Sequence, residues 1–154
     1  MIKQCFFIGY SATPEAVRPL LIESIKKHII EYGVTEFIVG RHGGFCAMAS
    51  NILGEVKKEF PHIKNRLALT QAPIEPIPLP AGFEDSFYPE ELELYPMRKA
   101  VPSLDRIMLR QVGYLIAYSD GNAPDSPHRF MQYAIELQKN KQLVITNLAE
   151  LLVL

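Results

Sequence analysis

Residues 39–49 read VGRHGGFCAMA, and they join a short β-prone run to a helical pattern. The run FIV at 37–39 favours a strand, and apolar residues then recur at helical spacing from Met48 to Phe60. A strand, a glycine-rich turn and a helix in this order bring backbone N–H groups and the positive end of a helix dipole to one point. The stretch therefore predicts an α/β fold with an anion-binding turn at one edge of its sheet.

The chemistry of this turn favours a phosphate or another oxyanion. Gly43 and Gly44 have no Cβ, so the chain can take a positive φ and a ligand can approach the backbone. Arg41 and His42 add hydrogen-bond donors. The alternative is a tight turn whose glycines serve only its shape. The candidate ligand-binding residues of the turn are Gly40, Arg41, His42, Gly43, Gly44 and Phe45.

Length and composition indicate one soluble globular domain over residues 1–154. Apolar residues make up 48% of the chain and charged residues 21%, which is an ordinary balance for a globular protein. The net charge of −1 argues against nucleic acid or an anionic membrane as a partner, because both select basic surfaces. We therefore expect a small-molecule ligand and no nucleic-acid or membrane partner.

The cellular compartment is predicted from the cysteines and the N-terminus. Cys5 and Cys46 belong to separate predicted elements, which suits free thiols in a reducing cytosol. The start of the chain has no signal-peptide pattern, and no apolar run approaches the length of a membrane span. The sequence predicts a cytoplasmic protein.

The rest of the chain repeats the alternation of strand and helix. Thr13 is the expected N-cap of the first helix, and Gly33 is expected to end it. Five predicted strands alternate with four helical segments, which favours a Rossmann-like three-layer sandwich with a parallel sheet in the order 3-2-1-4-5. The apolar tail at 148–154 is expected to pack on the core or on a second subunit, which would make a homodimer. The predicted strands are 5–8, 36–39, 65–70, 114–118 and 143–146.

Two further turns are expected at the same sheet edge as the glycine turn, because the carboxyl ends of parallel strands meet there. Three polar, glycine-bearing turns converging on one edge favour a ligand site over a coincidence of turn shapes. The additional candidates are Gly9, Tyr10 and Ser11 after the first strand, and Ser119, Asp120 and Gly121 after the fourth.

Residues 71–96 form a proline-rich, acidic insertion that holds six of the twelve prolines. Proline cannot join a strand ladder or a helix interior without cost, so most of this stretch is expected to be irregular. Four aromatic residues, Phe83, Phe87, Tyr88 and Tyr95, need a place to pack and argue against disorder. The insertion is either a solvated loop with aromatic anchors or a lid over the site.

Six segments in this order resemble the SLOG superfamily (the Smf/DprA-LOG Rossmann-like fold), and within it the YpsA-type bacterial proteins. The resemblance implies a Rossmann-like sheet of five or more strands and a pocket for a nucleotide or nucleotide-derived ligand, such as an ADP-ribose-like molecule. It further implies a sensor or effector rather than a metabolic enzyme. The segments are FIGY at 7–10, GVTEFIVG at 33–40, GGF at 43–45, KKEFP at 57–61, LIAY at 115–118 and ITNL at 145–148.

The chain departs from this resemblance where the enzymes of the superfamily carry their motif. Those enzymes release the base of nucleoside monophosphates, and their Pro-Gly-Gly-x-Gly-Thr motif with a following glutamate corresponds to SDGNAPDS at 119–126 here. Cys46 replaces a usual aspartate, and Leu104 with Asp105 replaces an arginine-asparagine pair. Ligand binding is therefore expected ahead of catalysis. The alternative is an N-glycosidase that uses Asp120 or Asp125 as its carboxylate.

The remaining candidate groups are a thiol and the histidines. Cys46 is expected in the first turn of the second helix, where the helix dipole would lower its pKa and make it a reactive thiol. His28 and His62 are expected to be solvated. Neither cysteines nor histidines have the spacing of a metal site, so no metal is predicted.

Overall fold

One parallel sheet organises the computed structural model, which describes residues 2–119 and 126–152. Its order is β4-β3-β2-β1-β5-β6, and every neighbouring pair is parallel. This confirms the predicted α/β class. The order differs from 3-2-1-4-5 by one added edge strand, β4. The strands are β1 (Gln4–Gly9), β2 (Glu36–Val39), β3 (Lys64–Ala68), β4 (Asp85–Phe87), β5 (Tyr114–Tyr118) and β6 (Val144–Asn147).

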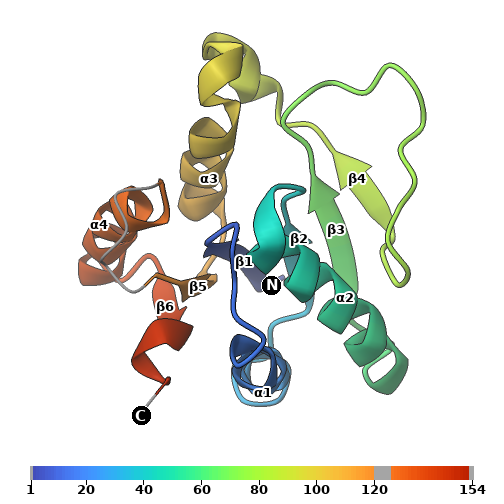
Figure 1. Cartoon of the computed structure of the whole chain (residues 1–154), viewed down its shortest axis with the longest axis vertical. Coiled ribbons are helices and arrows are strands. Elements are labelled where there is room, and N and C mark those ends of the chain that lie inside the picture. Colours follow the sequence, from blue (N-terminus) through green and yellow to red (C-terminus); the bar gives the residue numbers. More distant parts are fainter. Residues whose placement is uncertain (1, 120–125, 153–154) are drawn as a thin grey trace.

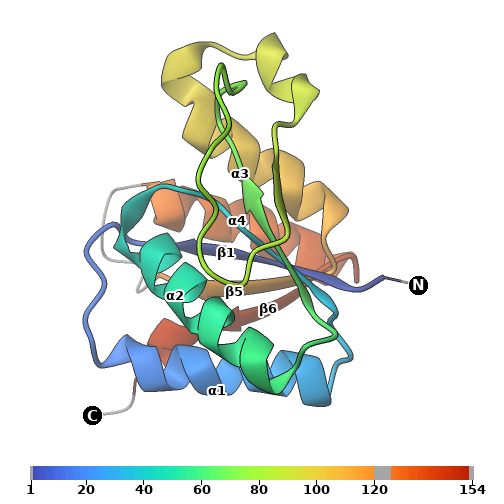
Figure 2. The same ribbon diagram turned by 90° about the vertical axis from the view of Figure 1, so that its right-hand side faces the viewer.

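Helices cover both faces of the sheet and make three layers (Figures 1 and 2). The helices α1 (Val17–Ile30) and α2 (Gly43–Glu59) pack on one face. The helices α3 (Ala100–Gln111) and α4 (Ser126–Lys139) pack on the other. Successive residues of β1 point to opposite faces, so Phe7 joins one apolar core and Phe6 the other. None of the described helices is long and apolar enough to cross a membrane.

Several element ends differ from the predictions. The first helix begins at Val17, and the Thr13 hydroxyl donates to the Tyr10 carbonyl at 2.8 Å instead of capping the helix. The third strand ends at Ala68, two residues earlier than expected. In the tail, Leu148 is fully buried within η3 (Leu148–Glu150), whereas Leu151 is half-exposed. Residues 153 and 154 lie outside the described residues.

The insertion contains regular structure that the sequence did not predict. The short strand β4 pairs with β3, and Arg66 secures it by donating to Asp85 at 2.9 Å and lying over the Phe87 ring. Two short 3-10 helices, η1 (Glu90–Leu94) and η2 (Met97–Lys99), follow and contact α3. A three-residue strand has too few residues to show a period of two, which explains why the sequence pattern missed it.

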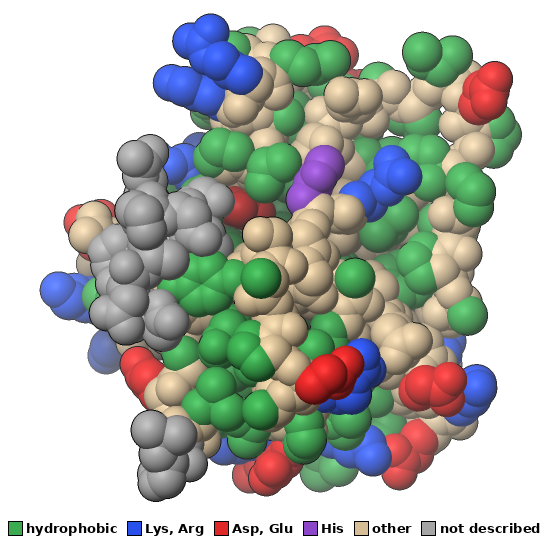
Figure 3. Space-filling model, viewed as in Figure 1, with side chains coloured by type: hydrophobic (Ala, Val, Ile, Leu, Met, Phe, Trp, Pro, Cys, Tyr) green, Lys and Arg blue, Asp and Glu red, His purple; other side chains and the backbone are tan. Residues whose placement is uncertain are grey.

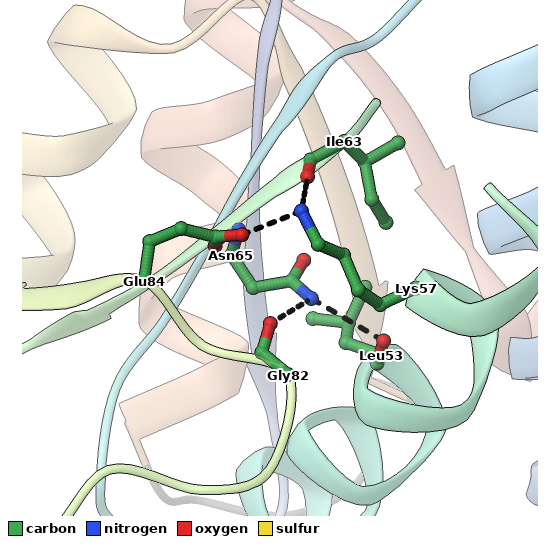
Figure 4. A network of polar contacts seen from close by, with 6 residues as sticks. All are labelled: Leu53, Lys57, Ile63, Asn65, Gly82 and Glu84. Carbon is green, nitrogen blue, oxygen red and sulfur yellow. Dashed lines mark hydrogen bonds and ion pairs between the residues drawn. The ribbon is translucent and has the colours of Figure 1, made fainter. Parts of the chain in front are cut away.

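A polar cluster fastens the first half of the insertion to α2 and β3 (Figure 4). The side-chain amide of Asn65 donates to the carbonyls of Leu53 and Gly82 at 3.2 and 3.1 Å. Glu84 accepts from the Asn65 backbone N–H at 2.8 Å and pairs with Lys57 at 2.5 Å. The chain between β3 and β4 therefore lies beside α2 (Figure 2), anchored at its base.

His28 corrects a prediction, because it is fully buried rather than solvated. Its Nδ1 donates to the Ser24 carbonyl at 2.6 Å, and its ring meets Tyr32 and Tyr114 edge-on. Its position on α1 faces the sheet, which the helical spacing from Leu21 and Ile25 could have indicated. Burial lowers the pKa of His28, so the ring is held in its neutral form.

Candidate functional site

A cavity of about 200 Å³ opens at the carboxyl ends of β1 and β2, and Figure 1 views the molecule from this edge. The start of α2 forms one wall and the first half of α3 forms another. The cavity brings together six predicted residues: Gly9, Ser11, Gly40, His42, Gly43 and Cys46. The remaining described lining comes from Phe6, Phe7, Ile8, Val101, Leu104 and Asp105.

Two N–H groups expected to be free for an anion are already used. The Gly44 N–H donates to the Ser11 carbonyl at 2.7 Å, and the Phe45 N–H donates to the Tyr10 carbonyl at 3.2 Å. The loop after β1 therefore caps the start of α2 through its own backbone. This corrects the picture of an open N-terminus. Gly43, with φ of +90°, remains at the cavity wall.

Close packing explains two of the glycines. A Cβ on Gly44 would stand 2.4 Å from the Ser11 carbonyl oxygen, and a Cβ on Gly9 would stand 2.3 Å from the Phe45 ring. Both distances are far below van der Waals contact, so these positions accept no side chain without rearrangement. The lack of a side chain at Gly9 and Gly44 therefore allows β1, its loop and α2 to pack closely, whatever binds beside them.

Tyr10 and Phe45 lie in the core, away from the cavity wall. The Phe45 ring stacks on Tyr118 at 6.5 Å between centroids, and Tyr10 meets Tyr118 edge-on at 5.5 Å. Ser119, after β5, exchanges backbone hydrogen bonds with the Asn147 side chain at 3.1 and 2.8 Å. The predicted candidates Asp120 and Gly121 lie outside the described residues.

Arg41 and His42 line different hollows. His42 lines the cavity and its Nε2 lies 3.1 Å from the Thr70 hydroxyl, whereas Arg41 lines a neighbouring hollow with Ser50 and Pro78. Both side chains are exposed. On this edge, Figure 3 shows a histidine (purple) and a Lys or Arg side chain (blue) close together in the upper half of the face.

The pKa of Cys46 is raised, not lowered as its place at the start of α2 predicted. Cys46 lies in the first turn of α2 as expected, half-buried between the cavity and the hollow lined by Arg41. Burial, with a smaller contribution from the nearby Asp105, raises the pKa of Cys46 to about 12, although backbone hydrogen bonds with Gly40 and His42 act to lower it. Desolvation outweighs the helix dipole here, so the thiol stays protonated.

Asp105 is the residue that the sequence prediction missed as a site residue. It is 9% exposed, lies on α3 and lines the cavity. No other described residue forms a hydrogen bond or ion pair with its carboxyl group. Burial raises the pKa of Asp105 well above its ordinary value, so the neutral acid is favoured. A charged residue type between Leu104 and Met108, on the apolar face of α3, was the available signal.

Comparisons with known proteins add no further assignment: no family model matches the chain, and no curated protein is significantly similar to it. Within residues 2–119 and 126–152, no three His, Cys, Asp or Glu side chains are grouped as a metal site would need. The chemistry of the site is therefore that of the cavity lining. Its lining supplies one carboxyl group, one thiol, an imidazole and a hydroxyl among apolar walls.

Proposed function

We propose that this protein binds a nucleotide or nucleotide-derived small molecule, such as an ADP-ribose-like ligand, in the cavity at the carboxyl ends of β1 and β2. We propose that it acts as a sensor or effector rather than as an enzyme. The observation that carries the proposal is Asp105, a buried carboxyl group on the cavity wall without a described protein partner. A carboxyl group at an apolar cavity wall is poorly solvated, and a ligand that forms hydrogen bonds with it would offset part of that cost.

The position and size of the cavity support the same function. In open parallel sheets ligands bind beyond the carboxyl ends of the strands. A volume of about 200 Å³ gives room for part of a nucleotide, such as its base or sugar, with the rest outside. Ser11, His42 and Gly43 stand at the exposed mouth, where a phosphate would find hydrogen-bond donors. The two free cysteines suit the cytoplasmic location that we propose.

A thermal-shift screen against AMP, GMP, CMP, UMP and ADP-ribose tests this proposal. A ligand present at about 100 times its Kd stabilises the folded state by about 2.7 kcal/mol. For a chain of this size, each kcal/mol raises Tm by about 2–4 °C. We expect at least one of these compounds to raise Tm accordingly.

A variant that fills the cavity locates the effect. A Cβ on Gly40 would meet Leu104 at 3.9 Å and Cys46 at 4.0 Å, both cavity residues in ordinary contact. Gly40→Ala should therefore fold, and its methyl group in the cavity should weaken binding by roughly tenfold, about 1.4 kcal/mol. Gly113→Ala is the matched control, because nothing lies within 4 Å of that Cβ. Equal ligand shifts in both variants, or no shift in the wild type, would contradict the proposal.

One observation favours a second candidate function, an N-glycosidase acting on nucleoside monophosphates. A carboxyl group kept neutral by burial, as at Asp105, suits a general acid. Glycosidic cleavage commonly uses a pair of carboxyl groups, however, and Asp105 is the one carboxyl group among the described lining residues. Binding is therefore the preferred proposal. Release of free base from AMP or CMP, lost in Asp105→Asn, would support the enzyme instead.

A further inference from the structure

The surroundings of Asp105 limit what can lie at the deep end of the cavity. Val101 and Leu104 flank it on α3, and Cys46 faces it from α2. Among the described lining residues there is no Lys or Arg, and His42 stands at the exposed mouth. An anion placed beside Asp105 would meet apolar walls and a carboxyl group, with no cation to neutralise it.

An acid that stays neutral presents two complementary atoms side by side. Its O–H donates one hydrogen bond, and its carbonyl oxygen accepts another. No described residue uses either atom, so both are open towards the cavity. The edge of a nucleobase offers the matching pair, an N–H donor next to an acceptor atom, in a flat shape that fits between apolar walls.

We propose that the Asp105 carboxyl group pairs with an uncharged heterocyclic edge of the ligand, which therefore enters base first and leaves its phosphate outside. This inference rests on the proposed function and deepens it. Asp105 becomes the specificity-determining residue for the base, and the phosphate lies at the mouth near Ser11, His42 and Gly43. The phosphate then contributes less to affinity than the base does.

Calorimetric titration of three probes tests the orientation. The probes are the nucleoside monophosphate with the largest thermal shift among AMP, GMP, CMP and UMP, its nucleoside, and inorganic phosphate. We expect the nucleoside to bind within roughly tenfold of the monophosphate, a difference of about 1.4 kcal/mol. Inorganic phosphate at the same concentration should not compete with the monophosphate.

Two variants of Asp105 separate pairing from charge. Asn keeps a donor and an acceptor of similar shape, so Asp105→Asn should keep nucleoside affinity within about threefold. Leu keeps the volume and removes both polar atoms, so Asp105→Leu should weaken binding roughly tenfold or more. If Asp105→Leu fails to fold, the nucleoside affinity of Asp105→Asn and the phosphate competition still test the base-first orientation.

The outcomes distinguish this inference from the proposed function. A monophosphate that binds while its nucleoside does not, or phosphate that competes fully, would overturn the base-first orientation and leave the binding function standing. Equal losses in the Asn and Leu variants would show that the ligand needs an ionised carboxylate, which also overturns it. If neither nucleotide nor nucleoside binds, both proposals fail.

Discussion

Asp105 lowers the stability of the free protein at neutral pH. Its carboxyl group is buried and has no described partner, and its pKa is raised well above the ordinary value. The unfolded chain releases this proton near pH 4, whereas the folded chain retains it to higher pH. Stability is therefore lost as the pH rises from the unfolded pKa towards the folded pKa. Such a cost is typical of residues kept for a ligand.

Asp105→Asn should accordingly stabilise the protein at pH 7, by on the order of 1–3 kcal/mol, and much less at pH 3. Denaturant unfolding of both proteins across this pH range measures the difference. Asp85→Asn is the control, because the Asp85 side chain is 41% exposed and pairs with Arg66. Relative to the wild type, Asp85→Asn should be no more stable at pH 7 than at pH 3. A less stable Asp105→Asn protein at pH 7 would contradict our account of this residue.

The pKa of Cys46 is a property that the sequence alone could not predict. Cys46 was predicted correctly to lie in the first turn of α2. Its pKa, however, depends on its burial and on Asp105, which lies 59 residues away in the sequence. The dipole of α2 was the only influence that the sequence displayed, and it has the opposite sign. The environment of a buried group therefore could not be predicted from its own element.

At the scale of elements, the loop after β1 and the start of α2 form one unit. The strand-turn-helix order predicted the positions of both correctly, and with them the shared sheet edge of Gly9 and Gly43. The hydrogen bonds from Gly44 and Phe45 to this loop join residues more than 30 positions apart. No local pattern could display them, which is why the turn was expected to be open to a phosphate.

Gly44→Ala tests whether this unit is structural. Its Cβ would stand 2.4 Å from a backbone oxygen, which cannot rotate away, so the loop or the helix must shift. We expect a loss of roughly 1–3 kcal/mol in the free energy of unfolding. Gly113→Ala, with open space around its Cβ, should change stability much less. An unaffected Gly44→Ala protein would show that the loop is looser than these contacts indicate.

At the scale of the whole molecule, the alternation of apolar strands with amphipathic helices was enough to predict a parallel sheet and the relative order of its five main strands. The insertion was the exception. Its prolines predicted an irregular path. Arg66 and Asn65, both in β3, nevertheless form hydrogen bonds with it, and it contains the edge strand β4 and an anchored loop. The sequence did not indicate which segment would pair with β3 at the edge of the sheet, so these contacts could not be predicted.

The central claim is that a small nucleotide-like molecule occupies the cavity between β1, β2, α2 and α3, and Cys46 provides a direct test. Its thiol lines this cavity, whereas Cys5 is fully buried in β1 and reacts only when the protein opens. The measurement is the rate of iodoacetamide modification of each thiol, by mass spectrometry, with and without the nucleoside monophosphate that gives the largest thermal shift. We predict that Cys46 reacts faster than Cys5 in the free protein, and that the nucleotide slows modification of Cys46 several-fold. A nucleotide that raises Tm while Cys46 reacts at its original rate would place the ligand elsewhere and contradict the claim.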